Sequence, residues 1–212
     1  MNIADIRKDY KQQSLLETEL EKKPVLQFEK WWNEALHAGI DEANAMTLAT
    51  ASATGLPAAR IVLLKGFDER GFVFFTNYES FKGMQLQENP RACLVLFWKE
   101  LERQVRITGL VEKTTPAESD DYYNIRPVAS RIGAWASPQS RIVSSRDWLA
   151  ENEKRFASEF PDETIPRPPY WGGYRVKPIT MEFWQGRPSR LHDRIQYSLQ
   201  ETGNWQLERL AP

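Results

Sequence analysis

The spacing of apolar residues changes character along this chain near Met46. Before that point, apolar residues follow the i, i+3, i+4, i+7, i+8 spacing of a helix with one apolar face, at Phe28, Trp31, Trp32, Ala35 and Leu36. Pro24 suits the first turn of such a helix, and Gly39 suits its end. The pattern predicts a core-facing helix. It is preceded by a charged extension, residues 1–23, in which we expect one short helix.

Beyond Met46 the chain is built from short runs rich in β-branched and aromatic residues, which are typical of strands. The expected strands are 46–51, 58–65, 72–77, 91–98, 103–113, 173–176, 180–184, 190–199 and 205–210. Helices are expected at 79–88, after a Thr115 cap, and at 146–159. The first strands follow one another without intervening helices, so a doubly wound parallel sheet fits poorly. We predict a mainly β fold with peripheral helices, arranged as a closed or nearly closed antiparallel barrel.

Composition narrows the function classes. The 212 residues suit one domain with a terminal extension, and the net charge of −1 provides no global field for nucleic acid or an anionic membrane. Two histidines and one cysteine are too few for a metal site, so no metal is expected. The first residues lack the apolar core of a signal peptide, and the longest apolar run, 92–98, is too short to span a bilayer. We therefore expect a cytoplasmic protein.

The candidate chemistry consists of cations at strand ends and in loops. No Gly-x-Ser-x-Gly elbow and no glycine-rich phosphate loop occurs, and Cys93 lies in an apolar run where an inert buried thiol is expected. Arg60 and Lys65 bracket one apolar strand. They have opposite parity, so both reach one ligand only across the strand end or through a bulge. Tyr122 and Arg126 would face the same way on a continuing helix, and with Ser130 they could form a phosphate cup.

A second group of cations lies near the end of the chain. If residues 190–199 form a strand, Arg190, His192 and Arg194 share one face because strand side chains alternate. Positive charges on one strand face repel one another unless a bound anion or a nearby carboxylate neutralises them. We interpret this face as part of a site for a phosphorylated ligand.

Several ordered motifs resemble the pyridoxamine 5′-phosphate oxidase family. They are Arg60–Lys65, Glu102-Arg103-Gln104-Val105, Ile132-Gly133-Ala134-Trp135, Phe183-Trp184-Gln185-Gly186, Arg190-Leu191-His192-Asp193-Arg194 and Arg209-Leu210-Ala211-Pro212. The match runs in register from about Arg7 to Pro212. The resemblance implies an FMN-binding split β-barrel of antiparallel, Greek-key-like order, and a homodimer with FMN between the subunits. Residues 1–23 would be a substrate lid, and residues 24–212 the barrel domain with the C-terminal dimerisation strands.

The resemblance also implies the site residues. FMN contacts would fall on Arg60, Ile61, Val62, Leu63, Leu64, Lys65, Phe75, Thr76, Lys82, Gln104, Gln139, Ser140, Trp184 and Arg194. Substrate contacts would fall on Arg7, Lys8, Asp9, Tyr10, Lys65, Tyr122, Arg126, Ser130, Arg190, Leu191 and His192. Among these, Arg190 and His192 would lie against the substrate ring as the catalytic pair.

Two positions depart from the family pattern. Phe81 stands where an arginine commonly precedes the lysine, here Lys82, and Phe75 replaces a frequent tyrosine. Loss of one charged hydrogen bond typically costs about 1.5–3 kcal/mol. FMN affinity would fall by roughly one to two powers of ten unless another group compensates.

The implied reaction is oxidation of pyridoxamine or pyridoxine 5′-phosphate at C4′ to pyridoxal 5′-phosphate, a step of vitamin B6 salvage. The hydride passes to flavin N5, and dioxygen is reduced to hydrogen peroxide. His192 could handle a proton or only position the substrate. The alternatives are a non-catalytic split-barrel protein that binds FMN or a B6 phosphate, and a nicotinamide-dependent flavin reductase. A nucleic-acid-binding barrel is disfavoured by the net charge of −1.

Overall fold

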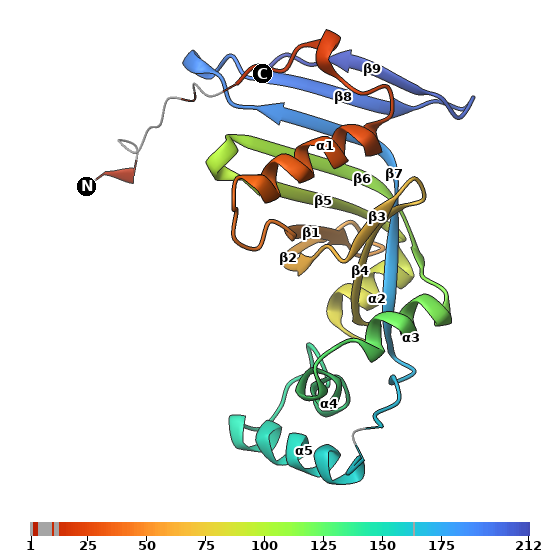
Figure 1. The fold of residues 1–212 in the computed structure, drawn as a ribbon. Helices are drawn as coiled ribbons and strands as arrows, with labels where there is room; N and C mark the ends of the chain where they lie inside the picture. Colours follow the sequence, from red (N-terminus) through yellow and green to blue (C-terminus); the bar gives the residue numbers. More distant parts are fainter. Residues whose placement is uncertain (1, 4–9, 11–12, 163) are drawn as a thin grey trace.

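One curled antiparallel sheet forms the body of the molecule (Figure 1). The computed structural model describes residues 2–3, 10, 13–162 and 164–212. The strands are β1 (Ala45–Ala51), β2 (Pro57–Leu63), β3 (Gly66–Asp68), β4 (Gly71–Asn77), β5 (Arg91–Trp98), β6 (Arg103–Lys113), β7 (Trp171–Gln185), β8 (Asp193–Leu199) and β9 (Trp205–Arg209). The helices are α1 (Pro24–His37), α2 (Phe81–Glu88), α3 (Pro116–Asn124), α4 (Val128–Ala136) and α5 (Arg146–Glu159).

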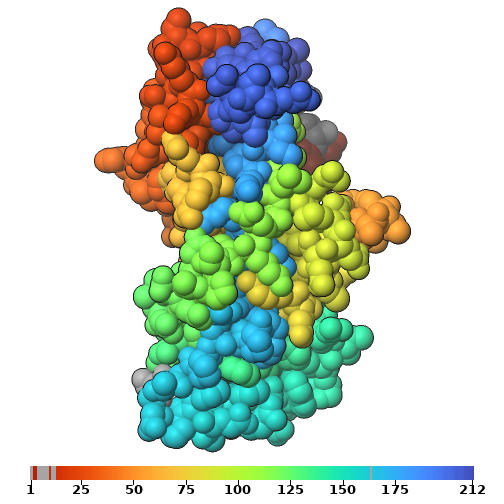
Figure 2. All heavy atoms as spheres, turned by 90° about the vertical axis from the view of Figure 1, so that its right-hand side faces the viewer, coloured from red at the N-terminus to blue at the C-terminus, as the bar shows by residue number. Residues whose placement is uncertain are grey.

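The sheet order is β2-β1-β5-β6-β7-β4-β3, with β8 added to β7 and β9 to β8. Every pairing is antiparallel. The sheet curls into a half-barrel, which confirms the mainly β, antiparallel fold with peripheral helices. Figure 2 shows α1 (red) and the C-terminal strands (dark blue) packed together at one end, and α5 (cyan) at the other. None of the helices in the described ranges is both long and apolar enough to cross a membrane.

Strand β7 organises the whole sheet. It was expected as two strands, 173–176 and 180–184, but it is continuous from Trp171 to Gln185. Its first half pairs with β4 and its second half with β8, while β6 runs along the other edge. Pro178 lies between the segments that pair with β4 and β8, opposite a register shift at Gly109 of β6. A Cβ on Gly109 would lie 2.0 Å from the carbonyl oxygen of Lys177, so only glycine fits there.

Helix α1 covers the inner face of the sheet, as its apolar spacing predicts. The Trp31 ring packs edge-on against Phe183, with centroids 5.2 Å apart, and Phe28 packs against Phe72 at 4.9 Å. Burying each such side chain contributes about 1.5–3 kcal/mol. A smaller core around Tyr123, packed with Ile165 and Trp171, joins α3 and α4 to the end of the sheet. Helix α3 starts with the predicted capping box of Thr115 and Glu118.

Besides the division of β7, other sequence-based expectations differ from the structure. The last long strand begins at Asp193, because Pro188–Arg190 form a 3₁₀ turn in which Arg190 has φ 62°. Arg190 therefore does not share a strand face with Arg194. Helix α3 ends at Asn124, so no single helix carries both Tyr122 and Arg126. A separate helix, α4, was not predicted. In the described part of the extension, a 3₁₀ turn occupies Glu17–Glu19.

Candidate functional site

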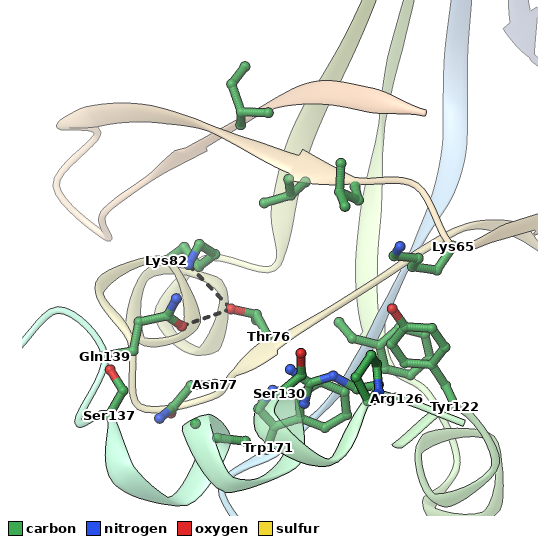
Figure 3. Close-up of a pocket in the computed structure, with 17 residues that line it drawn as sticks. Lys65, Thr76, Asn77, Lys82, Tyr122, Arg126, Ser130, Ser137, Gln139 and Trp171 are labelled. Atoms are coloured by element: carbon green, nitrogen blue, oxygen red, sulfur yellow. Dashed lines mark hydrogen bonds between the residues drawn. The ribbon is translucent and has the colours of Figure 1, made fainter. Parts of the chain in front are cut away.

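A pocket of about 660 Å³ opens where the ends of β2 and β4 meet α2, α3 and α4 (Figure 3). It brings together predicted cofactor and substrate residues, namely Ile61, Val62, Leu63, Lys65, Phe75, Thr76, Lys82, Tyr122, Arg126, Ser130 and Gln139. Residues of both parities line it because β2 ends at Leu63 and the ligand space lies across the strand end. Lys65, at one end of the Arg60–Lys65 segment, therefore lines the same space as Ile61, Val62 and Leu63.

One end of the pocket is built around Lys82, in the first turn of α2. Lys82 is only 8% exposed. Its ammonium group donates to Thr76 Oγ1 over 3.2 Å, and the Thr76 hydroxyl donates to Gln139 Oε1 over 3.2 Å. Burial, and then the charge of nearby Arg60, lower the pKa of Lys82. Among the described residues, no carboxylate forms an ion pair with Lys82 or Arg60. Two neighbouring cations without a carboxylate make this end suited to an anion such as a phosphate.

The other end is built around Arg126. Its guanidinium lies 4.5 Å from the centre of the Trp171 ring, and its Nη1 atom is buried without a hydrogen-bond partner among the residues that the structure describes. Burial lowers the pKa of Arg126. Figure 3 shows Ser130 and Tyr122 on the same side of the pocket, and the Lys65 ammonium lies 5.8 Å from the centre of the Tyr122 ring. Buried polar groups are normally satisfied, so the unpartnered nitrogen indicates a place for a second anion.

Flat aromatic rings line the space between these ends. Phe75 stacks on Tyr122 with centroids 4.0 Å apart, and it lies nearly parallel to Trp171 at 5.6 Å. Phe75 pairs across the sheet with Gly173, where a Cβ would come within 2.8 Å of the Phe75 ring. Trp171 was missed in the sequence, because the strand was expected to begin at Gly173. Parallel ring faces beside an apolar strand end suit a planar ligand.

A second group of predicted residues lies at the far end of β7. Gln104 and Arg194 are the register partners of Trp184 on the two neighbouring strands, so all three side chains share one face. The Trp184 ring lies 4.6 Å from that of His192, and Tyr10 packs edge-on against both. We call Tyr10, Gln104, Trp184, His192 and Arg194 the strand-end cluster. They do not line the pocket.

The ring of His192 has a defined hydrogen-bonding state. Its Nδ1 accepts the backbone N–H of Arg187 over 3.1 Å, so that nitrogen carries no proton. Burial, and then the charge of Arg190, lower the pKa of His192 below its usual value. At neutral pH the ring is therefore mostly uncharged, with its proton on Nε2. Nε2 of His192 can therefore donate a hydrogen bond, whereas Nδ1 already accepts one from Arg187.

The cations expected on one strand face at residues 190–194 lie apart in the structure. Arg190 is exposed in a turn, whereas Arg194 forms an ion pair with the buried carboxylate of Glu182. Leu191 is exposed. Arg60, Leu64 and Ser140 adjoin the pocket in sequence without lining it, and Arg7, Lys8 and Asp9 lie outside the described residues. Pocket-lining residues that were not predicted individually are Asn77, Pro127, Gly133, Ala134, Ser137 and Trp171.

The pocket and the strand-end cluster are far apart in one chain. Trp171 at the start of β7 belongs to the pocket, and Trp184 near its end belongs to the cluster. Thirteen residues of straight strand span about 43 Å at roughly 3.3 Å per residue. Figure 1 shows β7 crossing most of the molecule between these two regions.

Solved structures of similar shape define the class of fold. PhzG from Burkholderia lata, in complex with tetrahydrophenazine-1-carboxylic acid, aligns with a TM-score of 0.87 and 30% identity over 93% of this chain and 98% of that chain. A pyridoxamine 5′-phosphate oxidase-related, FMN-binding protein from Nostoc punctiforme aligns with a TM-score of 0.69 and 21% identity, over 87% and 97% of the two chains. The fold is that of the FMN-binding split-barrel proteins.

The family follows from the sequence. A family model described as pyridoxamine 5′-phosphate oxidase matches residues 32–155, and one for the pyridoxine 5′-phosphate oxidase C-terminal dimerisation region matches residues 171–212. The pyridoxine/pyridoxamine 5′-phosphate oxidase of Cupriavidus necator is 57% identical over 210 residues, which cover 99% of both chains. The chain belongs to the pyridoxamine 5′-phosphate oxidase family and is an oxidoreductase.

Proposed function

We propose that this protein oxidises pyridoxamine 5′-phosphate or pyridoxine 5′-phosphate to pyridoxal 5′-phosphate, with FMN as cofactor and dioxygen as the final electron acceptor. The observation that carries the proposal is a pocket with two separate cationic ends joined by flat aromatic rings. Two phosphorylated, planar ligands match this arrangement. Lys82 and Arg60 would hold the FMN phosphate, and Arg126 with Lys65 and Ser130 would hold the substrate phosphate.

The residues present fit both phosphates. Burying a cation costs free energy unless an anion pairs with it. Lys82 and the Nη1 atom of Arg126 are both buried, and neither pairs with a carboxylate among the described residues. Arg60 supplies a second positive charge near Lys82. FMN held by these residues would supply the redox chemistry, namely acceptance of a hydride from the substrate and reoxidation by dioxygen to give hydrogen peroxide. The protein supplies position and electrostatics.

The strand-end cluster completes the site in this proposal. Arg190 would orient the substrate ring over the flavin. His192, uncharged and with Nε2 as donor, would hold the substrate by a hydrogen bond rather than remove a proton. Tyr10 packs on Trp184 and His192, which supports a role for residues 1–23 as a lid that includes Arg7, Lys8 and Asp9.

The proposal includes a homodimer, which would bring the pocket and the strand-end cluster together. In one copy, a ligand in the pocket cannot reach Trp184 at the other end of β7, whereas a second copy can present its own Gln104, Trp184 and Arg194. The outward face of the sheet exposes Ile61 and Phe97, which suits a surface covered by a partner. The match to a C-terminal dimerisation region supports the same arrangement.

The proposal predicts a colour change that rival functions do not share. The FMN-loaded protein should be yellow, and its flavin band should bleach anaerobically on addition of pyridoxamine 5′-phosphate. On admission of air, colour should return with formation of hydrogen peroxide. A binding protein without catalysis would show no bleaching, and a flavin reductase would bleach with a reduced nicotinamide and not with pyridoxamine 5′-phosphate. Either result would refute the proposal.

A further inference from the structure

Glu182 is a buried carboxylate, 4% exposed, next to the strand-end cluster. It lies two residues before Trp184 on β7, so both side chains leave the sheet on the same face. Its Oε1 accepts a hydrogen bond from Arg194 Nε over 2.9 Å, and its Oε2 accepts one from Arg194 Nη2 over 3.2 Å. Oε2 also accepts from Arg106, on the neighbouring strand β6.

This pairing fixes the plane of the Arg194 guanidinium. Two parallel N–H···O bonds between a guanidinium and a carboxylate fix orientation as well as distance. The third nitrogen, Nη1, donates to the carbonyl oxygen of Ala211 over 2.8 Å. These contacts use one N–H on each nitrogen and leave a second N–H on each terminal nitrogen for a ligand. The hydrogen bond that Arg194 donates to Glu182 also raises the pKa of Arg194.

The contact between Glu182 and Arg194 is not needed to join β7 and β8. β7 and β8 are already joined by six register pairs from Thr180 to Gln185, and Arg106 alone would neutralise the Glu182 carboxylate. What the second arginine adds is a guanidinium held in one direction beside Trp184, its cross-strand partner. A loosely held arginine would lose side-chain entropy when a ligand binds, at a cost of up to about 2 kcal/mol.

We propose that Glu182 is a positioning residue that holds Arg194 in the orientation needed to contact FMN. The inference rests on the proposed function, in which Arg194 of one copy contacts the flavin bound in the pocket of the other. Glu182 itself touches neither cofactor nor substrate. Its contribution is to order Arg194 before FMN binds, which lowers the cost of binding.

A double-mutant cycle on FMN affinity tests this inference. FMN dissociation constants are measured by quenching of flavin fluorescence on the apo forms of the unaltered protein, E182Q, R194A and E182Q/R194A. We expect E182Q alone to weaken FMN binding roughly tenfold, since a charged hydrogen bond to the guanidinium is lost. In the R194A background, E182Q should have no further effect, because Glu182 acts through Arg194.

Two more variants separate orientation from general stability. E112Q makes the same chemical change at an exposed ion pair, Glu112 with Lys177 at 3.2 Å, and should leave FMN affinity unchanged. R194K keeps the charge but cannot form the two-bond contact, so it should weaken FMN binding about as much as E182Q. R194K also serves as the test if E182Q fails to fold.

The outcomes are distinct. Equal weakening by E182Q with and without Arg194 would show that Glu182 supports the fold, and would overturn the inference. Tight FMN binding by R194K would do the same. If R194A binds FMN as tightly as the unaltered protein, the Arg194 contact and this inference both fail. The reaction itself would still be judged by anaerobic bleaching with pyridoxamine 5′-phosphate, so the two failures can be told apart.

Discussion

Arg190→Ala should leave FMN bound while it lowers the rate of flavin reduction by pyridoxamine 5′-phosphate about 100-fold. Arg190 lies in an exposed turn beside His192, away from the cationic end formed by Lys82. Its loss should therefore spare the cofactor phosphate but let the substrate ring tilt over the flavin, and misplacement of about 1 Å can cost a factor of 100. Stopped-flow measurement of anaerobic flavin bleaching gives the rate, and fluorescence quenching gives FMN affinity.

The backbone at this position needs its own control. Arg190 has φ 62°, a conformation that glycine adopts without strain and alanine does not. Arg190→Gly removes the same side chain and favours the same turn. If both variants lose the rate equally, the side chain is responsible. An unchanged rate in both would exclude Arg190 from the reaction, and a loss in the alanine variant alone would assign the effect to the turn.

Arg126→Ala should raise the KM for pyridoxamine 5′-phosphate by one to two powers of ten, with little change in kcat. The buried Nη1 of Arg126 has no hydrogen-bond partner in the described part of the chain. A substrate phosphate would gain a charged hydrogen bond there, typically worth about 1.5–3 kcal/mol. The phosphate is remote from the reacting carbon, so its binding is felt equally in ground and transition states. Steady-state peroxide formation over a range of substrate concentrations measures both constants.

Arg155→Ala is the matched control for that change. Arg155 is an exposed arginine on α5 that pairs with Glu159, and its removal should leave both constants unchanged. A decrease confined to kcat in Arg126→Ala would contradict the phosphate role. So would an equal rise in KM in the control, since the effect would then follow net charge rather than this contact.

Local sequence patterns predicted the helices and strands whose apolar spacing matches the face that they bury. The apolar stripe that includes Phe28 and Trp31 placed α1, and alternating residues placed the strands of the first half of the sheet. Helix α4 was missed because Pro127 precedes it and Gly133 lies within it, both weak helix signals. The helix forms because its apolar face packs against the core around Tyr123. That packing is a tertiary effect without a local signature.

Strand boundaries near Pro178 and Arg190 also depend on tertiary structure that the local sequence does not reveal. A proline inside a strand pattern predicts a break, yet here it occupies the position where β7 changes partners. Nothing in the residues around Arg190 predicts a left-handed backbone there. For the site, family resemblance named most pocket residues. Trp171 and the contact of Glu182 with Arg194 come from pairings far apart in the chain, which only the folded structure reveals.

The length of β7 has a genetic consequence. Because one strand carries Trp171 to the pocket and Trp184 to the far cluster, each chain of the proposed dimer contributes unlike halves to two sites. A chain altered at Lys82 and a chain altered at Trp184 would each form inactive pairs with themselves. In a mixed pair, both lesions would fall in one site and the other site would be intact, so about half of the activity would return. Two defective alleles of this gene should therefore complement each other.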